Sequence, residues 1–138
     1  FRETSNKEFV LNLDQDSNPK KITKSIEIVY GLRNFIGNAN KFCKKKIFIT
    51  IKSDNEKVEV IIEDDGDGYP SDILSKIGEP YLKTLTNNKK EKGGLGLGIF
   101  IGKTLLEKNY ASLNCRNSKT RNGAEVIIKW SYRDLVKI

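Results

Sequence analysis

The segment GGLGLGIFIGKTLLEK, residues 93–108, decides the fold that we expect of this 138-residue chain. It opens with glycine at four of the six positions from Gly93 to Gly98 and continues with apolar residues at helical spacing, namely Leu97, Phe100, Ile101, Leu105 and Leu106. Free backbone N–H groups at a helix start, together with the helix dipole, suit a polyphosphate. The segment predicts a helix over Leu95–Lys108 whose beginning binds phosphate.

Two familiar phosphate-binding motifs do not fit this segment. The dinucleotide pattern GxGxxG fails because its third glycine would fall at Ile99 or Ile101, and because a polar loop precedes the glycines instead of a strand. The Walker pattern GxxxxGK[ST] fails because only three residues separate Gly98 from Gly102-Lys103-Thr104. Lys103 and Thr104 lie inside the helix, where we expect surface and packing roles.

A second helix is predicted from Pro19 to about Cys43. Its apolar face consists of Ile28, Leu32, Phe35, Ala39 and Phe42. Asn34, Asn38 and Lys41 share another side of the helix. Carboxamide oxygens suit a magnesium ion that keeps its waters and binds substrate phosphates, and Lys41 would add a positive charge. The alternative is a solvated helix face that happens to carry two asparagines.

The segments Lys46–Lys52 and Lys57–Glu63 predict a β-hairpin that runs into the sequence DDGDGYP. There, Asp64 can accept a hydrogen bond from an exocyclic amine, while Gly66 and Gly68 allow a sharp turn close to a flat ring. The alternative is an ordinary Asp-Gly turn. A helix-loop-helix calcium loop is excluded, because Pro70 stands where the pattern requires glycine.

The remaining elements complete a single domain over residues 1–138. We expect strands at Glu8–Leu13, Ala111–Cys115 and Ala124–Trp130, a short helix at Ser71–Lys76, and a mobile loop over TLTNNKKEKGG. Strands and helices in this order predict the α+β class, with helices on one face of a mixed sheet in a two-layer sandwich.

Composition excludes several other classes of protein. The chain is 37% hydrophobic and 31% charged and has no apolar run long enough to span a membrane, so we expect a soluble cytoplasmic domain. Its net charge of +7 comes without an aromatic-interleaved binding motif, which argues against nucleic acid. With no histidine and two distant cysteines, Cys43 and Cys115, zinc patterns are absent, and we expect two buried thiols.

Taken in order, these motifs resemble the ATPase domain of the gyrase, chaperone, histidine kinase and mismatch-repair superfamily, which has the Bergerat fold. The histidine kinase branch fits best. Its asparagine box resembles LRNFIGNANKF, its first glycine box DDGDGYP, its phenylalanine-box region IGEPYLKT, and its second glycine box GGLGLGIFIGKTLLE. The resemblance covers about residues 28–110, and within the branch these segments are most similar to the RegB/PrrB sensor kinases.

The resemblance implies a role for each matching position. Asn38 would be the principal magnesium ligand with Asn34 beside it, Lys41 would approach the phosphates, and Phe42 would pack near the sugar or base. Asp64 would bind the adenine amine, and Gly66 and Gly68 would shape that end of the pocket. The triphosphate would be bordered by Gly94, Gly96, Leu97 and Gly98, and an ATP lid would run from Thr84 to Gly93.

Asn34 discriminates within the superfamily that the chain resembles. Hydrolysing branches and serine kinases place there a glutamate that acts as general base, which an amide cannot do. A neutral imidazole is already a competent nucleophile, so positioning and charge neutralisation do most of the catalysis of transfer to histidine. One departure is Ala124, which stands where the family usually has threonine. Any support that the hydroxyl would lend to Asp64 is lost.

The implied activity is binding of Mg-ATP and transfer of its γ-phosphate to a histidine on a separate dimerisation domain, from which a response regulator receives it. Because the chain has no histidine, it would be inactive toward histidine in isolation. Any membrane attachment would belong to other parts of the full-length protein. The alternative function is a nucleotide-gated interaction module without phosphoryl transfer.

Overall fold

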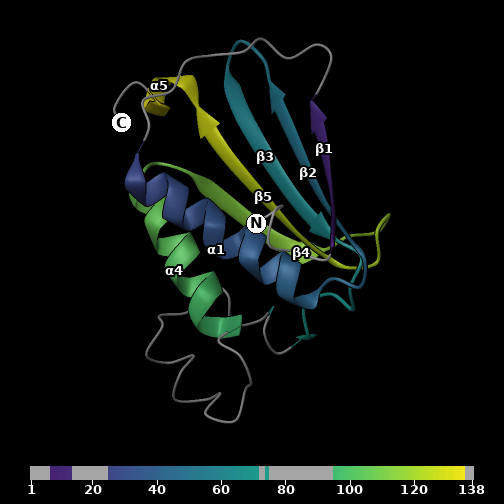
Figure 1. Cartoon of the computed structure of the whole chain (residues 1–138). Helices are drawn as coiled ribbons and strands as arrows, with labels where there is room; N and C mark the ends of the chain where they lie inside the picture. Colours follow the sequence, from purple (N-terminus) through teal and green to yellow (C-terminus); the bar gives the residue numbers. More distant parts are fainter. Residues whose placement is uncertain (1–6, 14–24, 72–73, 75–94, 136–138) are drawn as a thin grey trace.

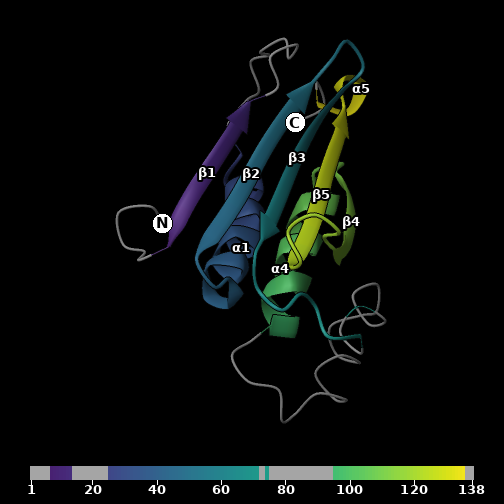
Figure 2. The same ribbon diagram turned by 90° about the vertical axis from the view of Figure 1, so that its right-hand side faces the viewer.

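A five-stranded mixed sheet carries both long helices on one face (Figures 1 and 2). The computed structural model describes residues 7–13, 25–71, 74 and 95–135. The strand order is β1-β2-β3-β5-β4, with β1 parallel to β2 and the other pairs antiparallel. No helix in these residues is long and apolar enough to cross a membrane. The elements are β1 (Glu8–Leu13), α1 (Ile26–Phe42), β2 (Lys46–Ser53), β3 (Lys57–Asp64), α4 (Leu95–Lys108), β4 (Ser112–Asn117), β5 (Ala124–Ser131) and α5 (Tyr132–Leu135).

These elements confirm the predicted two-layer α/β architecture, and most of their bounds lie within two residues of the sequence prediction. The predicted start of the first long helix is wrong. Ser25 is extended, with φ −116° and ψ 129°, and its side chain accepts a hydrogen bond from the backbone N–H of Ile28. Serine at this position satisfies a helix-terminal N–H group and begins a helix at the next residue. The predicted short helix at Ser71–Lys76 falls almost entirely outside the described residues.

Glycines allow α1 and α4 to pack closely against each other. A Cβ atom at Gly31 would lie 2.6 Å from Cγ of Leu106, and one at Gly102 would lie 2.8 Å from the ring of Phe35. The buried side of α4 is formed by Ile99, Gly102 and Leu106. Ile101, which we expected on the apolar face, is 37% exposed, because the helix turns Gly102 toward α1 instead.

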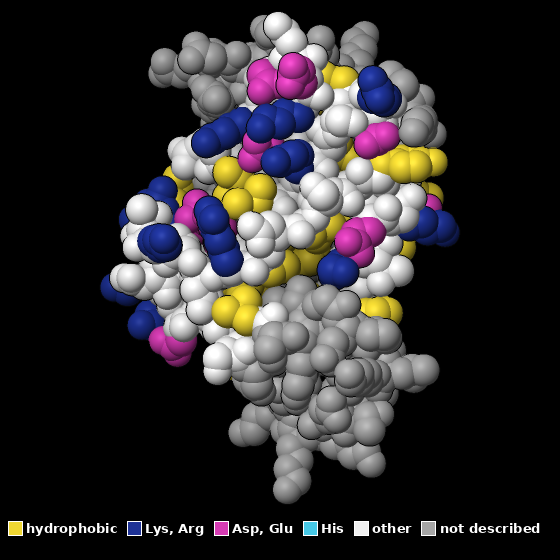
Figure 3. All heavy atoms as spheres, turned by 180° about the vertical axis from the view of Figure 1, so that it is seen from behind, with side chains coloured by type: hydrophobic (Ala, Val, Ile, Leu, Met, Phe, Trp, Pro, Cys, Tyr) yellow, Lys and Arg dark blue, Asp and Glu magenta, His cyan; other side chains and the backbone are white. Residues whose placement is uncertain are grey.

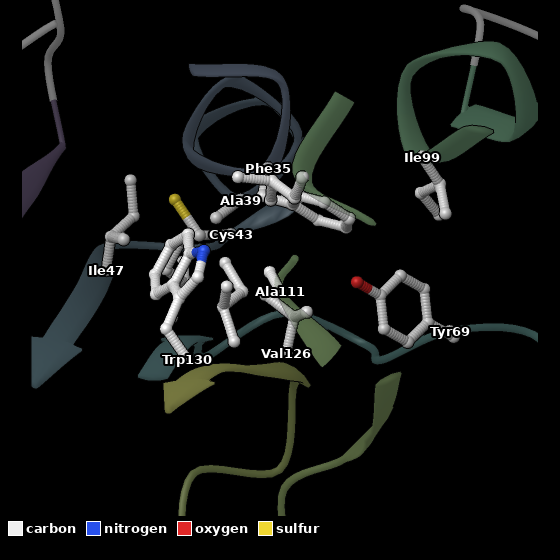
Figure 4. Packing of buried hydrophobic residues seen from close by; sticks show 12 residues of the cluster. Phe35, Ala39, Cys43, Ile47, Tyr69, Ile99, Ala111, Val126 and Trp130 are labelled. Carbon is white, nitrogen blue, oxygen red and sulfur yellow. The ribbon is translucent and has the colours of Figure 1, made fainter. Parts of the chain in front are cut away.

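The core lies between the helix layer and the sheet (Figure 4). Phe35 and Ala39 of α1 meet Ile47, Val126 and Trp130 of the sheet. The expectation of two buried thiols holds for Cys43, whereas Cys115 is only half-buried, and neither forms a disulfide. Burial raises the pKa of both thiols, that of Cys115 to about 11, which keeps them protonated near neutral pH.

The opposite face of the sheet is open (Figure 3), and lysine and arginine side chains gather on it around small hydrophobic areas. Two carboxylates, Glu63 and Glu125, face each other across β3 and β5 and are each 8% exposed. Neighbouring polar groups satisfy them: Ser118 Oγ donates to Glu63 at 2.8 Å, and Arg116 pairs with Glu125. Partners of this kind offset the cost of placing two like charges opposite each other.

Tyr110 ends α4 in an unfavourable backbone conformation. Its φ is 71°, and the N–H groups of Tyr110 and Ala111 donate to the carbonyls of Glu107 and Leu106. This left-handed position after a helix normally belongs to glycine, because a Cβ atom there costs about 1 kcal/mol. We expect Tyr110→Gly to raise the free energy of unfolding in urea by about 0.5 to 1 kcal/mol. A decrease would show that contacts of the half-exposed ring outweigh the backbone strain.

Candidate functional site

A pocket of about 220 Å³ opens between α1, the end of β3 and the start of β5. Its walls bring together segments that are far apart in the sequence. Apolar side chains form most of the lining, and the polar groups are few, as is typical of sites for small organic ligands. The lining residues are Phe35, Asn38, Ala39, Phe42, Ile62, Asp64, Asp67, Gly68, Tyr69, Pro70, Ala124 and Val126.

Asp64 is the buried carboxylate of this pocket, with 4% of its surface exposed. Its Oδ1 accepts hydrogen bonds from the backbone N–H groups of Gly66, at 2.9 Å, and Ala124, at 3.2 Å. Neither of these two hydrogen bonds involves the other carboxylate oxygen, Oδ2. Burial raises the pKa of Asp64, and the N–H groups of Gly66 and Ala124 partly oppose that shift. Asp64 therefore lines the pocket with one of its two oxygens, Oδ1, held by the backbone.

A second aspartate anchors the turn that follows β3. Asp65 accepts hydrogen bonds from the backbone N–H groups of Lys44, Lys45 and Lys46 at 2.8 to 3.2 Å. Burial alone would raise its pKa, but these N–H groups lower it. Gly66 sits against the end of α1, since a Cβ atom there would lie 2.3 Å from the carbonyl oxygen of Phe42. The turn is thus fastened to the connection between α1 and β2.

The far end of the turn is held by Asn117 at the end of β4. Gly68 has φ +81°, and a Cβ atom there would lie 2.6 Å from Oδ1 of Asn117. The same Oδ1 accepts from the backbone N–H of Tyr69 at 2.6 Å, and Nδ2 donates to the carbonyl of Tyr69 at 3.2 Å. Glycine is required at position 68 for both its conformation and this close approach.

The two asparagines of α1 point their side-chain oxygens toward α4. A Cβ atom on Gly98 would lie 3.8 Å from Oδ1 of Asn38 and 3.9 Å from Oδ1 of Asn34. Nδ2 of Asn34 donates to the carbonyl of Tyr30 at 2.8 Å, which turns Oδ1 away from its own helix. Two neutral oxygens therefore converge beside the first turn of α4, next to the pocket that Asn38 lines.

Comparison with known proteins relates this chain to a family of ATPases. Residues 23–134 match the family of histidine kinase-, DNA gyrase B- and HSP90-like ATPases. The chain belongs to this family. It is 32% identical over 138 aligned positions to the sensor histidine kinase RegB of Cereibacter sphaeroides, an alignment that covers 89% of the chain and 30% of RegB. This ATPase domain is thus of the histidine kinase type, and it spans less than a third of that relative's length.

Solved structures confirm the Bergerat fold of this ATPase domain. The mycobacterial sensor histidine kinase MprB superimposes with a TM-score of 0.70 at 20% identity, covering 94% of this chain and 85% of that one. The full-length ShkA in complex with AMPPNP superimposes with a TM-score of 0.65 at 24% identity, covering 89% of this chain and 25% of that one. At these identities the likeness concerns the fold.

The ATPase domain brings some of the sequence-predicted residues together and leaves others apart or undescribed. Asn38, Phe42, Asp64 and Gly68 line one pocket, and Gly66 shapes the turn beside it. Lys41 is exposed, and its Nζ lies 5.4 Å from the centre of the Phe42 ring. The backbones of Gly96 and Leu97 belong to the first turn of α4. Thr84, Gly94 and the proposed lid lie outside the described residues.

Sequence reasoning missed Asp65, Asn117 and Gly123. A Cβ atom on Gly123 would lie 2.1 Å from the carbonyl oxygen of Asp64 and 2.2 Å from its Oδ1. Ala124 provides no hydroxyl, yet its backbone N–H binds Asp64 directly. The one sequence signal for this arrangement was the Asn122-Gly123 pair, which is typical of a tight turn.

Proposed function

We propose that this ATPase domain binds Mg-ATP and transfers the γ-phosphate to a histidine on a separate dimerisation domain. The observation that carries the proposal is the buried Asp64, whose Oδ1 is held by two backbone N–H groups at the edge of a largely apolar pocket. A carboxylate oxygen can accept a hydrogen bond from the exocyclic amine of adenine, while Phe42 and Ala39 present apolar surface to the ring.

The converging oxygens of Asn34 and Asn38 fit a magnesium ion. Mg²⁺ prefers oxygen ligands, keeps several waters and is commonly completed by substrate phosphates. Neutral carboxamides would bind it weakly without the nucleotide, so metal and ATP should bind together. Bound there, Mg²⁺ would neutralise charge on the phosphates. Because Gly98 has no side chain, this position adds no atoms beside the two oxygens, which would lie 3.8 and 3.9 Å from a Cβ atom there.

The proposed acceptor follows from the chemistry of position 34. An amide cannot take a proton from water or a hydroxyl, so Asn34 favours an acceptor that is already nucleophilic, such as neutral imidazole. The chain contains no histidine, so the proposed acceptor would lie on another domain. A response regulator would then take the phosphoryl group. The AMPPNP complex of ShkA supports nucleotide binding by this fold.

Two measurements test the proposed function in sequence. Calorimetric titration with AMPPNP should detect binding that strengthens when Mg²⁺ is added. Incubation with labelled ATP and a dimerisation domain carrying the acceptor histidine should then produce acid-labile, base-stable phosphoprotein. Magnesium-dependent binding without any phosphohistidine would favour the nucleotide-gated interaction module instead, and the absence of AMPPNP binding would refute both readings.

Gly98→Ala separates metal binding from stability. Its methyl group would lie in ordinary contact with Asn34 and Asn38, at 3.9 and 3.8 Å from their Oδ1 atoms. Alanine inside a helix is more stable than glycine by about 0.5 to 1 kcal/mol, so the free energy of unfolding should not fall. We expect the gain in AMPPNP affinity that Mg²⁺ produces to shrink about tenfold, because the methyl group displaces the ion's water shell. An undiminished magnesium effect would contradict the metal assignment.

A further inference from the structure

We infer that Asn117 is a positioning residue for the base end of the nucleotide pocket, an inference that rests on the proposed function. Asn117 does not line the pocket itself. It contacts the backbone of the segment Gly68–Pro70, which does. We expect Asn117 to determine where this wall lies, and therefore how tightly a base bound against Asp64 is enclosed.

The contact between Asn117 and Tyr69 has the geometry of a strand pairing. One carboxamide accepts from the N–H of Tyr69 at 2.6 Å and donates to its carbonyl at 3.2 Å. The side chain thus satisfies both polar groups of a single backbone residue. Two bonds from one planar group restrict the position and the orientation of that residue, whereas a single bond restricts mainly its distance.

The ring of Tyr69 packs in the core beside the same strand. Cys115 and Asn117 are two residues apart on β4 and project from the same face. Tyr69 is 8% exposed and belongs to the buried core cluster against which Cys115 packs, with its hydroxyl oxygen turned toward the packed interior (Figure 4). Asn117 at the end of β4 therefore holds the backbone of Tyr69 while the ring of Tyr69 packs in the core, and both restrict the wall between Gly68 and Pro70.

Asn117 is also connected to the opposite wall of the pocket, which contains Ala124 and Asp64. Asn117 pairs in register with Ala124, whose N–H donates to Asp64 Oδ1 at 3.2 Å. The next residue, Ser118, closes the loop by donating its N–H to the carbonyl of Gly123 at 2.7 Å. Movement at Asn117 would thus alter the spacing between the wall at Tyr69 and the carboxylate of Asp64.

Solvent exposure makes the positioning role separable from a purely structural one. Asn117 is exposed, so water can replace its hydrogen bonds to Tyr69 when the side chain is removed. The melting temperature should then fall by about a few degrees at most. Without these hydrogen bonds, the turn at Gly68 would sample more positions in the free protein. Restricting it again when a ligand binds would cost conformational entropy and weaken the affinity.

The test compares Asn117→Ala with Asn114→Ala, both measured well below their melting temperatures. Asn114 lies on the same strand but on the opposite, open side, and is also exposed. We expect Asn117→Ala to weaken ADP without Mg²⁺ and AMPPNP with Mg²⁺ by the same factor of about ten. The gain in affinity produced by Mg²⁺ should stay unchanged, and Asn114→Ala should bind both ligands like the wild type.

Different outcomes identify which claim fails. If Asn117→Ala binds both ligands with wild-type affinity, the inference is overturned and the proposed function remains intact. The same holds if the variant loses only the gain in affinity that Mg²⁺ produces. If the wild type binds neither ligand, the proposed function fails and the inference with it. Should Asn117→Ala not fold, Asn117→Asp keeps the shape and the acceptor but sets a carboxylate oxygen against the carbonyl of Tyr69, and it should weaken both ligands at least as much.

Discussion

Replacing Asp64 by asparagine should weaken AMPPNP binding about 100-fold or more, while the domain stays folded. The asparagine Oδ1 can still accept from the N–H groups of Gly66 and Ala124, so the local backbone is retained. Nδ2 then replaces Oδ2 and presents a donor to the donor amine of adenine. Calorimetric titration checks the affinity, and circular dichroism checks the fold.

A change of base provides the control for Asp64→Asn. Inosine triphosphate has an oxygen acceptor where adenine has its amine, so the variant should lose far less affinity for it than for ATP. Equal losses for both nucleotides would indicate general damage to the pocket. Unchanged affinity of the variant for AMPPNP would refute the assignment of Asp64 to the base.

The same variant should change stability in a pH-dependent way. Burial raises the pKa of Asp64 above its ordinary value of 3.8, so the folded state binds this proton more tightly than the unfolded state does. The resulting stability is fully present below pH 3.8 and is lost as the pH rises through the folded-state pKa. In urea unfolding, the free energy of unfolding of Asp64→Asn should therefore increase relative to that of the wild type as the pH rises from acid to neutral. A difference that stays constant with pH would contradict this.

Gly123→Ala should be the most destabilising of the substitutions considered. Its Cβ atom would lie 2.1 Å from the backbone carbonyl oxygen of Asp64, and backbone cannot move aside as a flexible side chain does. We expect the free energy of unfolding to fall by about 3 kcal/mol, as measured in urea, and nucleotide binding to be lost because β5 is pushed away from Asp64.

The neighbouring substitution Asn122→Gly is the matched control. Asn122 has φ 68°, a conformation that glycine adopts freely, so this change should leave stability and nucleotide binding close to wild type. If Gly123→Ala were equally mild, the loop between β4 and β5 would be able to shift, and its close packing on Asp64 would not be essential.

Local sequence patterns predicted the elements well where the periodicity of apolar residues is strong. The bounds of β1 and α4 agree with the prediction. The alternation in β1 indicates a strand but not its buried face, because Leu11 is 62% exposed. The predicted start of α1 is wrong because Pro19 suits a helix start in sequence, whereas the helix begins after Ser25, which is a typical N-cap residue. The exposure of Ile101 depends on the contact of Gly102 with α1, which no local pattern contains.

The candidate site was predictable only where a residue type implies a chemistry. Asp64 and Asn38, separated in sequence, do line one pocket, as their carboxylate and amide groups suggested. Asn117 contacts Tyr69 across 48 residues of chain, and Gly123 contacts Asp64 across a similar span. Such contacts depend on tertiary packing, so a single sequence carries no spacing rule that would reveal them.

The glycine-mediated contact of α1 with α4 has a consequence for ligand affinity. Because Gly31 and Gly102 have no side chains, Leu106 and the ring of Phe35 pack directly against the facing helix, and this close packing resists sliding of one helix along the other. The separation between the paired amides and Gly98 is then preset in the free protein. Little conformational entropy remains to be lost at this junction when a ligand arrives, so a larger share of the contact energy appears as binding free energy.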